Sequence, residues 1–382
     1  MPRQATLATI PTWYNPRLAP PYPDYGQVIY DIPGTYYWTC PAGVVDVSVV
    51  CIGGGGSGAY ATAFDNRYDL NAQQYYYVST SSQSGGGGGG LGYRTMRQGG
   101  SGYNSPLVPG TTYTVVVGKG GYNTTTSWLP ASGGTSYFHS TIVCAGLGGS
   151  AGTRSTTSTG SAPGGVGGGW YGDGGGNGGT GGSSYGISGF CGGGGGAGGY
   201  GYNGGNGGYR TSSALVYNGT NGFRSGSGGS GGRNVRFTCH WHDYKAVAGN
   251  GGGSNIFGVI SQVSNTTYGG VATLLGDGGT GARDNGESYV NPADPITYGL
   301  TSSSYVTPIG KNTVNGVTYA GTLATGYGAG SGAESYTAHD GATASPIVRG
   351  NRGAVRIIWS GKTNTRYYPS TRIGDETTQP TI

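Results

Sequence analysis

The fold is decided by the stretch Val44-Val45-Asp46-Val47-Ser48-Val49-Val50-Cys51-Ile52. Apolar residues at 45, 47, 49 and 51 alternate there with polar ones at 46 and 48. Such a period of two indicates a half-buried strand, because successive side chains of a strand point to opposite faces. Glycines 53–56 follow at once, so the sequence predicts a strand that runs directly into glycine-rich chain.

Other short β-rich runs lie outward from this stretch in both directions. We predict strands at residues 28–30, 36–39, 113–117, 141–144, 235–238, 271–275 and 354–359. No stretch shows a convincing helical period, and the runs are separated by Gly, Asn, Ser and Thr. The chain is therefore predicted to be all-β, an antiparallel β-sandwich with long glycine-rich loops. Since strong strands lie near both ends of the chain, we expect the sheet to close by long-range pairing.

Glycine supplies 88 of the 382 residues, and it is concentrated in the block 146–232. This block is either a flexible linker, a low-complexity tail, or backbone ordered by hydrogen bonds to neighbouring segments. We predict order, because rings such as those of Trp170, Tyr185 and Phe190 offer apolar area that a solvated coil would leave exposed. The block has no strict Gly-X-Y period, which excludes collagen, while packed polyproline II segments stay an alternative to irregular loops.

Composition divides the chain into an arm, a domain and a tail. Residues 1–33 are proline-rich and predict an extended docking arm; residues 34–373 form the glycine-rich β-sandwich domain, with additional strands and loops at 233–345; residues 374–382 are a C-terminal tail. The net charge is only +5, but residues 349–372 hold six cations and no acid. That run is interpreted as a solvated basic end, with an anion-facing patch as the alternative.

Cysteine usage and hydropathy indicate where the chain folds. The five cysteines are widely spaced and form no C-x-x-C pair, which is typical neither of a disulfide framework nor of a zinc site. No apolar run approaches membrane-spanning length, and residues 1–15 do not resemble a signal peptide. We expect folding in a reducing cytoplasm, with no membrane insertion and no nucleic acid as partner.

Catalytic motifs are interpreted as products of composition. The two G-x-S-x-G matches, at 148–152 and 228–232, lie in glycine tracts without the strand and helix that a nucleophile elbow needs. His240 and His242 lie on one face of a predicted strand and are a weak metal candidate. We expect no enzyme activity, no metal and no cofactor.

Aromatic residues in the loops are the candidate binding residues. Tyrosine among Ser, Gly and Asn is typical of adaptable recognition surfaces, because its ring gives a large contact area at low entropy cost. The alternative is that the rings cover bare glycine backbone, and the two interpretations can coexist. The candidates are Tyr75, Tyr76, Tyr77, Trp170, Tyr171, Tyr200 and Tyr202.

Residues 34–56, G-T-Y-Y-W-T-C-P-A-G-V-V-D-V-S-V-V-C-I-G-G-G-G, resemble the opening of a glycine-rich domain found in tail fibres and other virion proteins of tailed phages. Residues 109–121, P-G-T-T-Y-T-V-V-V-G-K-G-G, are similar to its second strand and turn. Residues 353–359, followed by Y-P-S-T at 368–371, resemble the C-terminal strand and tail of marine cyanophage members. The resemblance implies a virion structural or host-recognition protein and no catalytic residues.

Three function classes follow. The first is a tail-fibre or distal adhesin module, a homotrimer that binds host surface glycans and joins other virion proteins through its N-terminal arm. The second is a capsid-surface or baseplate decoration protein without receptor binding. The third, a glycine-rich ice-binding or cell-wall protein, explains flat polyproline II layers but not the P-A-G-V opening at 41–44. In the first two classes the chain is made in the host cytoplasm and resides in the virion.

Overall fold

The computed structural model describes residues 25–61, 64–69, 74–79, 81–99, 107–123, 129–156, 160–185, 190–210, 216–217, 235–236, 245–247, 251–254, 256, 313–314, 317–318, 327–336 and 349–361. All regular structure in these residues is β, which confirms the all-β prediction. In this part of the chain no helix is long and apolar enough to span a membrane.

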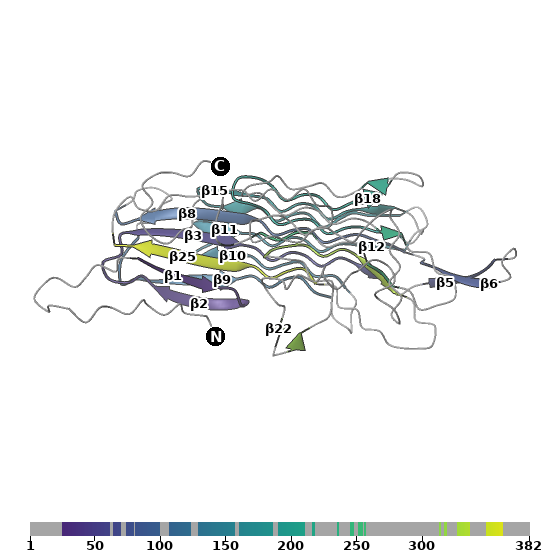
Figure 1. Ribbon diagram of the computed structural model, residues 1–382, viewed down its shortest axis with the longest axis horizontal. Coiled ribbons are helices and arrows are strands. Elements are labelled where there is room, and N and C mark those ends of the chain that lie inside the picture. The colour runs from purple at the N-terminus through teal and green to yellow at the C-terminus, as the bar shows by residue number, and fades with distance from the viewer. Residues whose placement is uncertain are drawn as a thin grey trace, which may run out of the picture.

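Two five-stranded sheets lie face to face at one end of the molecule (Figure 1). The first is ordered β1 (Tyr25–Tyr30), β25 (Ala354–Ser360), β3 (Asp46–Ile52), β8 (Leu91–Arg97) and β15 (Gly174–Gly176). The second is ordered β14 (Trp170–Tyr171), β11 (Cys144–Gly146), β10 (Ser136–Phe138), β9 (Thr112–Val117) and β2 (Gly34–Thr39). Every strand pair in both sheets is antiparallel, as predicted.

The last described strand, β25, joins the two ends of the chain. It lies between β1 and β3, with Ile357 opposite Val28 on one side and Val49 on the other. Long-range closure of the sheet is therefore confirmed. Because β1 is part of this sheet, Tyr25–Tyr30 belong to the sandwich rather than to the arm predicted at 1–33. Residues 1–24 of the predicted arm, and the predicted tail at 374–382, lie outside the described residues.

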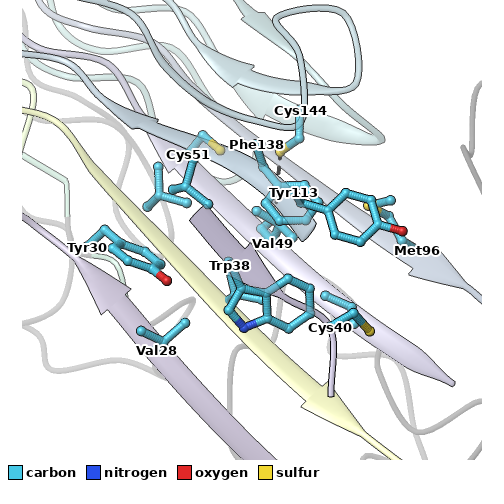
Figure 2. Close-up of a cluster of buried hydrophobic side chains, with 14 of the residues drawn as sticks. Val28, Tyr30, Trp38, Cys40, Val49, Cys51, Met96, Tyr113, Phe138 and Cys144 are labelled. Carbon is cyan, nitrogen blue, oxygen red and sulfur yellow. Dashed lines mark hydrogen bonds between the residues drawn. The ribbon is translucent and has the colours of Figure 1, made fainter. Parts of the chain in front are cut away.

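An apolar core fills the space between the sheets (Figure 2). Trp38 is at its centre, with ring centroids 5.9 Å from Phe138, 6.0 Å from Tyr113 and 5.8 Å from Trp359. β3, β8 and β25 contribute side chains from the facing sheet: Val47, Val49, Cys51, Met96, Val355 and Ile357. The alternation read from residues 45–51 thus turns Val47, Val49 and Cys51 to the core.

The prediction that β3 is half-buried is wrong, since all seven of its residues are buried. A second apolar cluster covers the other face of its sheet, with members Val50, Ile52, Leu91, Tyr93, Tyr200, Ile256, Tyr327 and Ala354. The buried carboxylate of Asp46 also lies 3.6 Å from Arg97 Nε. Strand periodicity could not show this covering layer, because it comes from remote loops.

Other local predictions had mixed outcomes. Residues 141–143 form a turn, and the strand there, β11, begins only at Cys144. His139 starts this turn with φ at 63°, which breaks the extended backbone after β10. The predicted strand at 235–238 is described only at β20 (Val235–Arg236), and the one at 271–275 lies outside the described residues.

Short strands complete the fold. A four-stranded sheet is ordered β12 (Arg154–Ser155), β7 (Ser82–Gln83), β17 (Phe190–Cys191) and β20, and a three-stranded sheet is ordered β21 (Lys245–Val247), β24 (Glu334–Tyr336) and β4 (Tyr60–Ala61). The two-stranded sheets are β13 (Ser161–Ala162) with β16 (Ser184–Tyr185), β18 (Tyr209–Arg210) with β19 (Val216–Tyr217), β22 (Thr313–Val314) with β23 (Val317–Thr318), and β5 (Phe64–Asp69) with β6 (Gln74–Ser79). The β5–β6 hairpin projects from the end opposite the sandwich (Figure 1).

Candidate functional site

Beyond the sandwich the chain runs as glycine-rich segments side by side, which we call the glycine bundle (Figure 1). Its segments are 53–59, 84–90, 118–123, 129–134, 147–153, 163–169, 177–183, 192–198, 203–209, 251–254, 328–333 and 349–353. The Gly53 amide donates to the Gly90 carbonyl (2.9 Å), and three residues later the Gly56 amide donates to Gly87 (2.8 Å). A polyproline II helix has three residues per turn, so this repeat indicates packed polyproline II segments rather than irregular loops.

Segment 84–90 lies inside the bundle. Three successive amides, those of Gly85, Gly86 and Gly87, donate to three different neighbouring segments. The acceptors are the carbonyls of Gly182, Ser331 and Ser150, at 2.9–3.0 Å. Hydrogen bonds between segments thus satisfy backbone that has few side chains to bury. The prediction that the glycine block is ordered is confirmed for 146–156, 160–185 and 190–210.

Close approach of the segments explains why they are glycine. A Cβ added at Gly88 would lie inside 3.0 Å of the backbone of Gly196, and 2.9 Å from the amide nitrogen of Ala197. Real Cβ atoms essentially never show such separations. A side chain is therefore excluded at such positions. Backbone hydrogen bonds hold the segments together, supplemented by a few buried hydroxyls such as that of Ser331, which accepts from the Gly58 amide.

Outer segments of the bundle carry side chains at every third residue. In segment 177–183 two glycines separate Asn177 from Thr180, and two more separate Thr180 from Ser183. Asn177 and Thr180 are exposed. The neighbouring segment 203–209 repeats the pattern, and its asparagine side chains accept hydrogen bonds from backbone amides of segment 177–183. Asn203 Oδ1 accepts from the backbone amide of Asn177, and Asn206 Oδ1 accepts from that of Thr180, both at 2.9 Å. The bundle therefore presents side chains in register on a rigid surface.

The aromatic residues predicted to bind are divided between the two ends of the molecule. Trp170 and Tyr171 form β14 at the edge of the sandwich, with Trp170 half-buried and Tyr171 exposed. Strand β15 lies between Trp170 and the exposed Tyr202. Of its glycines, Gly175 is next to the Trp170 indole and Gly176 is next to the Tyr202 backbone. Tyr75, Tyr76 and Tyr77 belong to β6, in the hairpin at the far end (Figure 1).

Tyr200 is a correction to the predicted binding set. Its side chain is only 2% exposed and belongs to the cluster that covers the outer face of the first sheet. The ring stacks on Tyr93, with centroids 6.1 Å apart. Tyr200 therefore covers the sheet and cannot present its ring to a ligand, whereas Tyr202, two residues on, is exposed.

Cysteine thiols in the described residues are buried and free, and Figure 2 shows those of Cys40, Cys51 and Cys144. Burial raises the pKa of Cys191 to about 12 and that of Cys40 to about 11. Burial, with the adjacent Cys144, also raises the pKa of Cys51 well above its ordinary value. The thiols of Cys40, Cys51 and Cys191 therefore stay protonated at neutral pH. The buried cysteines act as small apolar side chains, as expected for the runs that hold Cys51 and Cys144.

Candidate catalytic and metal residues gain no support. Ser150 lies in an extended bundle segment and donates its amide to Val166, so the G-x-S-x-G match at 148–152 lacks the elbow geometry. His240 and His242 lie outside the described residues. Within the part of the chain that is described, no group of three His, Cys, Asp or Glu side chains could hold a metal.

Ion pairs fix the sandwich at its surface. Arg94 Nε lies 3.2 Å from Asp173 Oδ1, which joins β8 to the turn after β14. Arg352 Nη2 lies 3.2 Å from Asp31 Oδ2, which ties the β1–β2 turn to the segment before β25. The hydroxyl of Tyr327 also donates to Asp31, and burial, followed by the nearby Asp31 charge, raises the pKa of Tyr327 to about 12.

A protein family matches this chain. A family model described as a glycine-rich domain matches residues 31–281, more than half of the chain. The matched span includes the β3 strand and most segments of the glycine bundle. No curated protein matches the chain.

Proposed function

The chain belongs to the glycine-rich domain family, and from this premise we propose that it is a structural protein of a tailed-phage virion, a tail-fibre or distal adhesin module that binds host cell-surface glycans. The protein is not an enzyme in this proposal. It is made in the host cytoplasm and resides in the virion. The phage assignment rests on the resemblance of residues 34–56, 109–121 and 353–371.

The observation that carries the proposal is the glycine bundle. Its segments are fixed by backbone hydrogen bonds at intervals of three residues, so outward side chains keep set positions without a hydrophobic core beneath them. A rigid surface loses little conformational entropy on binding, which favours many shallow contacts. This suits attachment to repetitive glycans better than to a small molecule in a deep pocket.

Several copies strengthen such binding. We propose a homotrimer, in which weak contacts from each copy combine into avidity without any deep pocket. Exposed aromatic residues, including Tyr171 and Tyr202, supply the contacts, because aromatic faces suit sugar rings. The N-terminal arm joins the module to other virion proteins.

Masking the protein on intact virions tests the proposal. Virions incubated with Fab fragments against the full chain are expected to lose adsorption to host cells, while Fab fragments against an unrelated capsid protein leave adsorption unchanged. Undiminished adsorption after saturation with the specific Fab would contradict an adhesin role.

The exposed edge of β2 favours the alternative, a capsid-surface or baseplate decoration protein. Among the described residues β2 is the last strand of its sheet, and its Tyr37 is 70% exposed. A neighbouring virion protein could pair with this edge, as extended chains do with open sheet edges. Deleting residues 1–24, which leaves β1 intact, separates the two functions. Loss of virion incorporation with cell binding retained supports the adhesin, and a full-length protein that binds no cells supports decoration.

A further inference from the structure

Two neighbouring segments of the glycine bundle, 118–123 and 349–353, bring together cations from distant parts of the sequence. They run antiparallel: the Gly350 amide donates to the Gly121 carbonyl and the Gly353 amide to the Gly118 carbonyl, both at 2.9 Å. Tyr122 is paired with Arg349 across the two segments. The second segment opens the basic run at 349–372, for which the sequence offers an anion-facing patch as the alternative interpretation.

The three-residue repeat turns particular side chains outward. Lys119 and Tyr122 are three residues apart and exposed, while Gly118, Gly121 and Asn123 around them are buried. On the other segment Arg349 and Arg352 are three residues apart and half-buried, with buried residues between them. The same backbone geometry that requires glycine inside thus aligns an aromatic ring and cations outside.

The ring of Tyr122 lies near two of these cations. Lys119 Nζ and Arg349 Cζ are each 5.6 Å from the centroid of its ring, within the range of a cation–π interaction. The two cations are therefore separated by at most twice that distance. The Tyr122 side chain is 40% exposed, so part of it stays open to a ligand. We call Lys119, Tyr122 and Arg349 the Tyr122 site.

The surroundings of the Tyr122 site are basic. Segment 129–134 borders it, since the Gly134 amide donates to the Lys119 carbonyl (2.7 Å). None of the segments 118–123, 129–134 and 349–353 contains an acidic residue. Asp31, on the turn between β1 and β2, lies 3.2 Å from Arg352. The local field therefore favours an anion.

We propose that the Tyr122 site binds an acidic sugar unit of a polysaccharide, one that carries a carboxylate or sulfate group. The guanidinium and ammonium groups would donate charge-assisted hydrogen bonds to the anionic group, and the exposed part of the tyrosine ring would contact the apolar face of the sugar. This inference rests on the proposed function. It adds to that function the class of glycan that is bound and the protein residues that bind it.

Calorimetric titration of the full-length protein at an ionic strength of about 0.15 M, where the screening length is about 8 Å, tests the site. The probes are a galacturonate pentamer, a sulfated oligosaccharide of equal length, and a neutral glucose pentamer. Binding of either acidic probe is expected to exceed that of the neutral one, and the stronger of the two identifies the anionic group. The double variant Lys119→Gln/Arg349→Gln is expected to raise the Kd for that probe about tenfold or more, and Tyr122→Ala is expected to raise it several-fold.

The matched control is Arg154→Gln, which removes one exposed cation on β12, outside the segments that form the site. It is expected to change the Kd by less than about twofold, since screening limits the reach of a distant charge. Equal weakening by Arg154→Gln and Arg349→Gln, with unfolding midpoints unchanged, would overturn the site in favour of bulk charge. So would equal binding of acidic and neutral probes.

Adsorption to host cells separates this proposal from the one it rests on. If the wild-type protein binds cells and the Lys119, Tyr122 and Arg349 variants bind them equally, the Tyr122 site is refuted and the adhesin stands. If the wild-type protein binds the acidic probe but no cells, the site stands and the adhesin is refuted.

Discussion

Two adjacent glycines allow the close packing of the bundle to be tested with a single methyl group. Gly168 is buried, and a Cβ added there would lie well inside 3.0 Å of the Leu147 carbonyl oxygen and 2.7 Å from its carbon. A Cβ added at Gly169 would meet only side-chain atoms, Leu147 Cδ1 at 3.6 Å and Asn177 Oδ1 at 3.8 Å, which are ordinary contacts. Neither glycine has a positive φ in the left-handed region, so Gly169→Ala is a matched control.

The expected cost of Gly168→Ala follows from what must move. The Leu147 carbonyl accepts a hydrogen bond from the Gly90 amide (2.9 Å), and displacing it breaks that bond inside the bundle. Overpacking costs about 1–3 kcal/mol and an unsatisfied buried backbone group about 1–3 kcal/mol. We therefore expect a loss of about 3 kcal/mol in the free energy of unfolding. At Gly169 the reduced entropy of the unfolded chain is expected to change stability by about 0 to +1 kcal/mol.

Urea unfolding of both purified variants, followed by tyrosine and tryptophan fluorescence, measures the difference. The midpoint of Gly168→Ala should fall clearly below that of the wild type, while that of Gly169→Ala should equal or exceed it. Equal midpoints for the two variants would refute the close-packed bundle, because a flexible tether would accept a methyl group at either position.

Three further outcomes are expected. Gly194→Val should disrupt folding or assembly, since an added side chain would meet the Gly330 carbonyl, whereas half-buried Ser183→Ala should change the melting temperature by no more than about 2 °C. Tyr200→Ala should cost about 3 kcal/mol in a denaturant titration, because its ring is buried against Tyr93, and a cost below 1 kcal/mol would argue against that burial. The free energy of unfolding should fall from about pH 9 toward pH 12, because the folded-state pKa values of Cys191 and Tyr327 are raised above their unfolded values. The stability that the two protonated groups contribute is complete at lower pH and is lost as pH rises through that range. A urea midpoint that stays constant from pH 8 to 12 would contradict this.

Local periodicity was sufficient to predict the sandwich strands. The alternation at 45–51 became the central strand β3, and the runs at 36–39, 113–117 and 354–359 became β2, β9 and β25. The turn at 141–143 could not be found in the same way, because a short apolar run does not reveal that His139 reverses the backbone before it. The burial of the outer face of β3 also depends on contacts between distant loops.

The glycine bundle carried a signal that the sequence analysis missed. Absence of a strict period over the whole block hid short local repeats of three, such as N-G-G-T-G-G-S at 177–183 and N-G-G-N-G-G-Y at 203–209. Each repeat marks a polyproline II segment with two faces against neighbours and one face outward. The same repeat, applied to K-G-G-Y at 119–122, would have found Lys119 and Tyr122 on one face.

Binding residues were harder to predict than strands. Tyr200 and Tyr202 have the same composition around them, yet the first is buried and the second exposed. Their difference depends on how one turn lies against Tyr93, which no property of the local sequence fixes. Likewise, only the folded chain brings Arg349 next to Tyr122.

Hydrogen exchange resolved to single amides tests the ordered glycine bundle most directly. In the inner segment every amide from Gly85 to Gly90 donates to a neighbouring segment, so all of them are expected to exchange slowly. In the outer segment 163–169, the amides of Gly165 and Gly168 donate to Gly85 and Gly88, while no described acceptor takes those of Gly164 and Gly167. The account predicts slow exchange at Gly165 and Gly168, with fast exchange at Gly164 and Gly167. Uniformly fast exchange through both segments would contradict it.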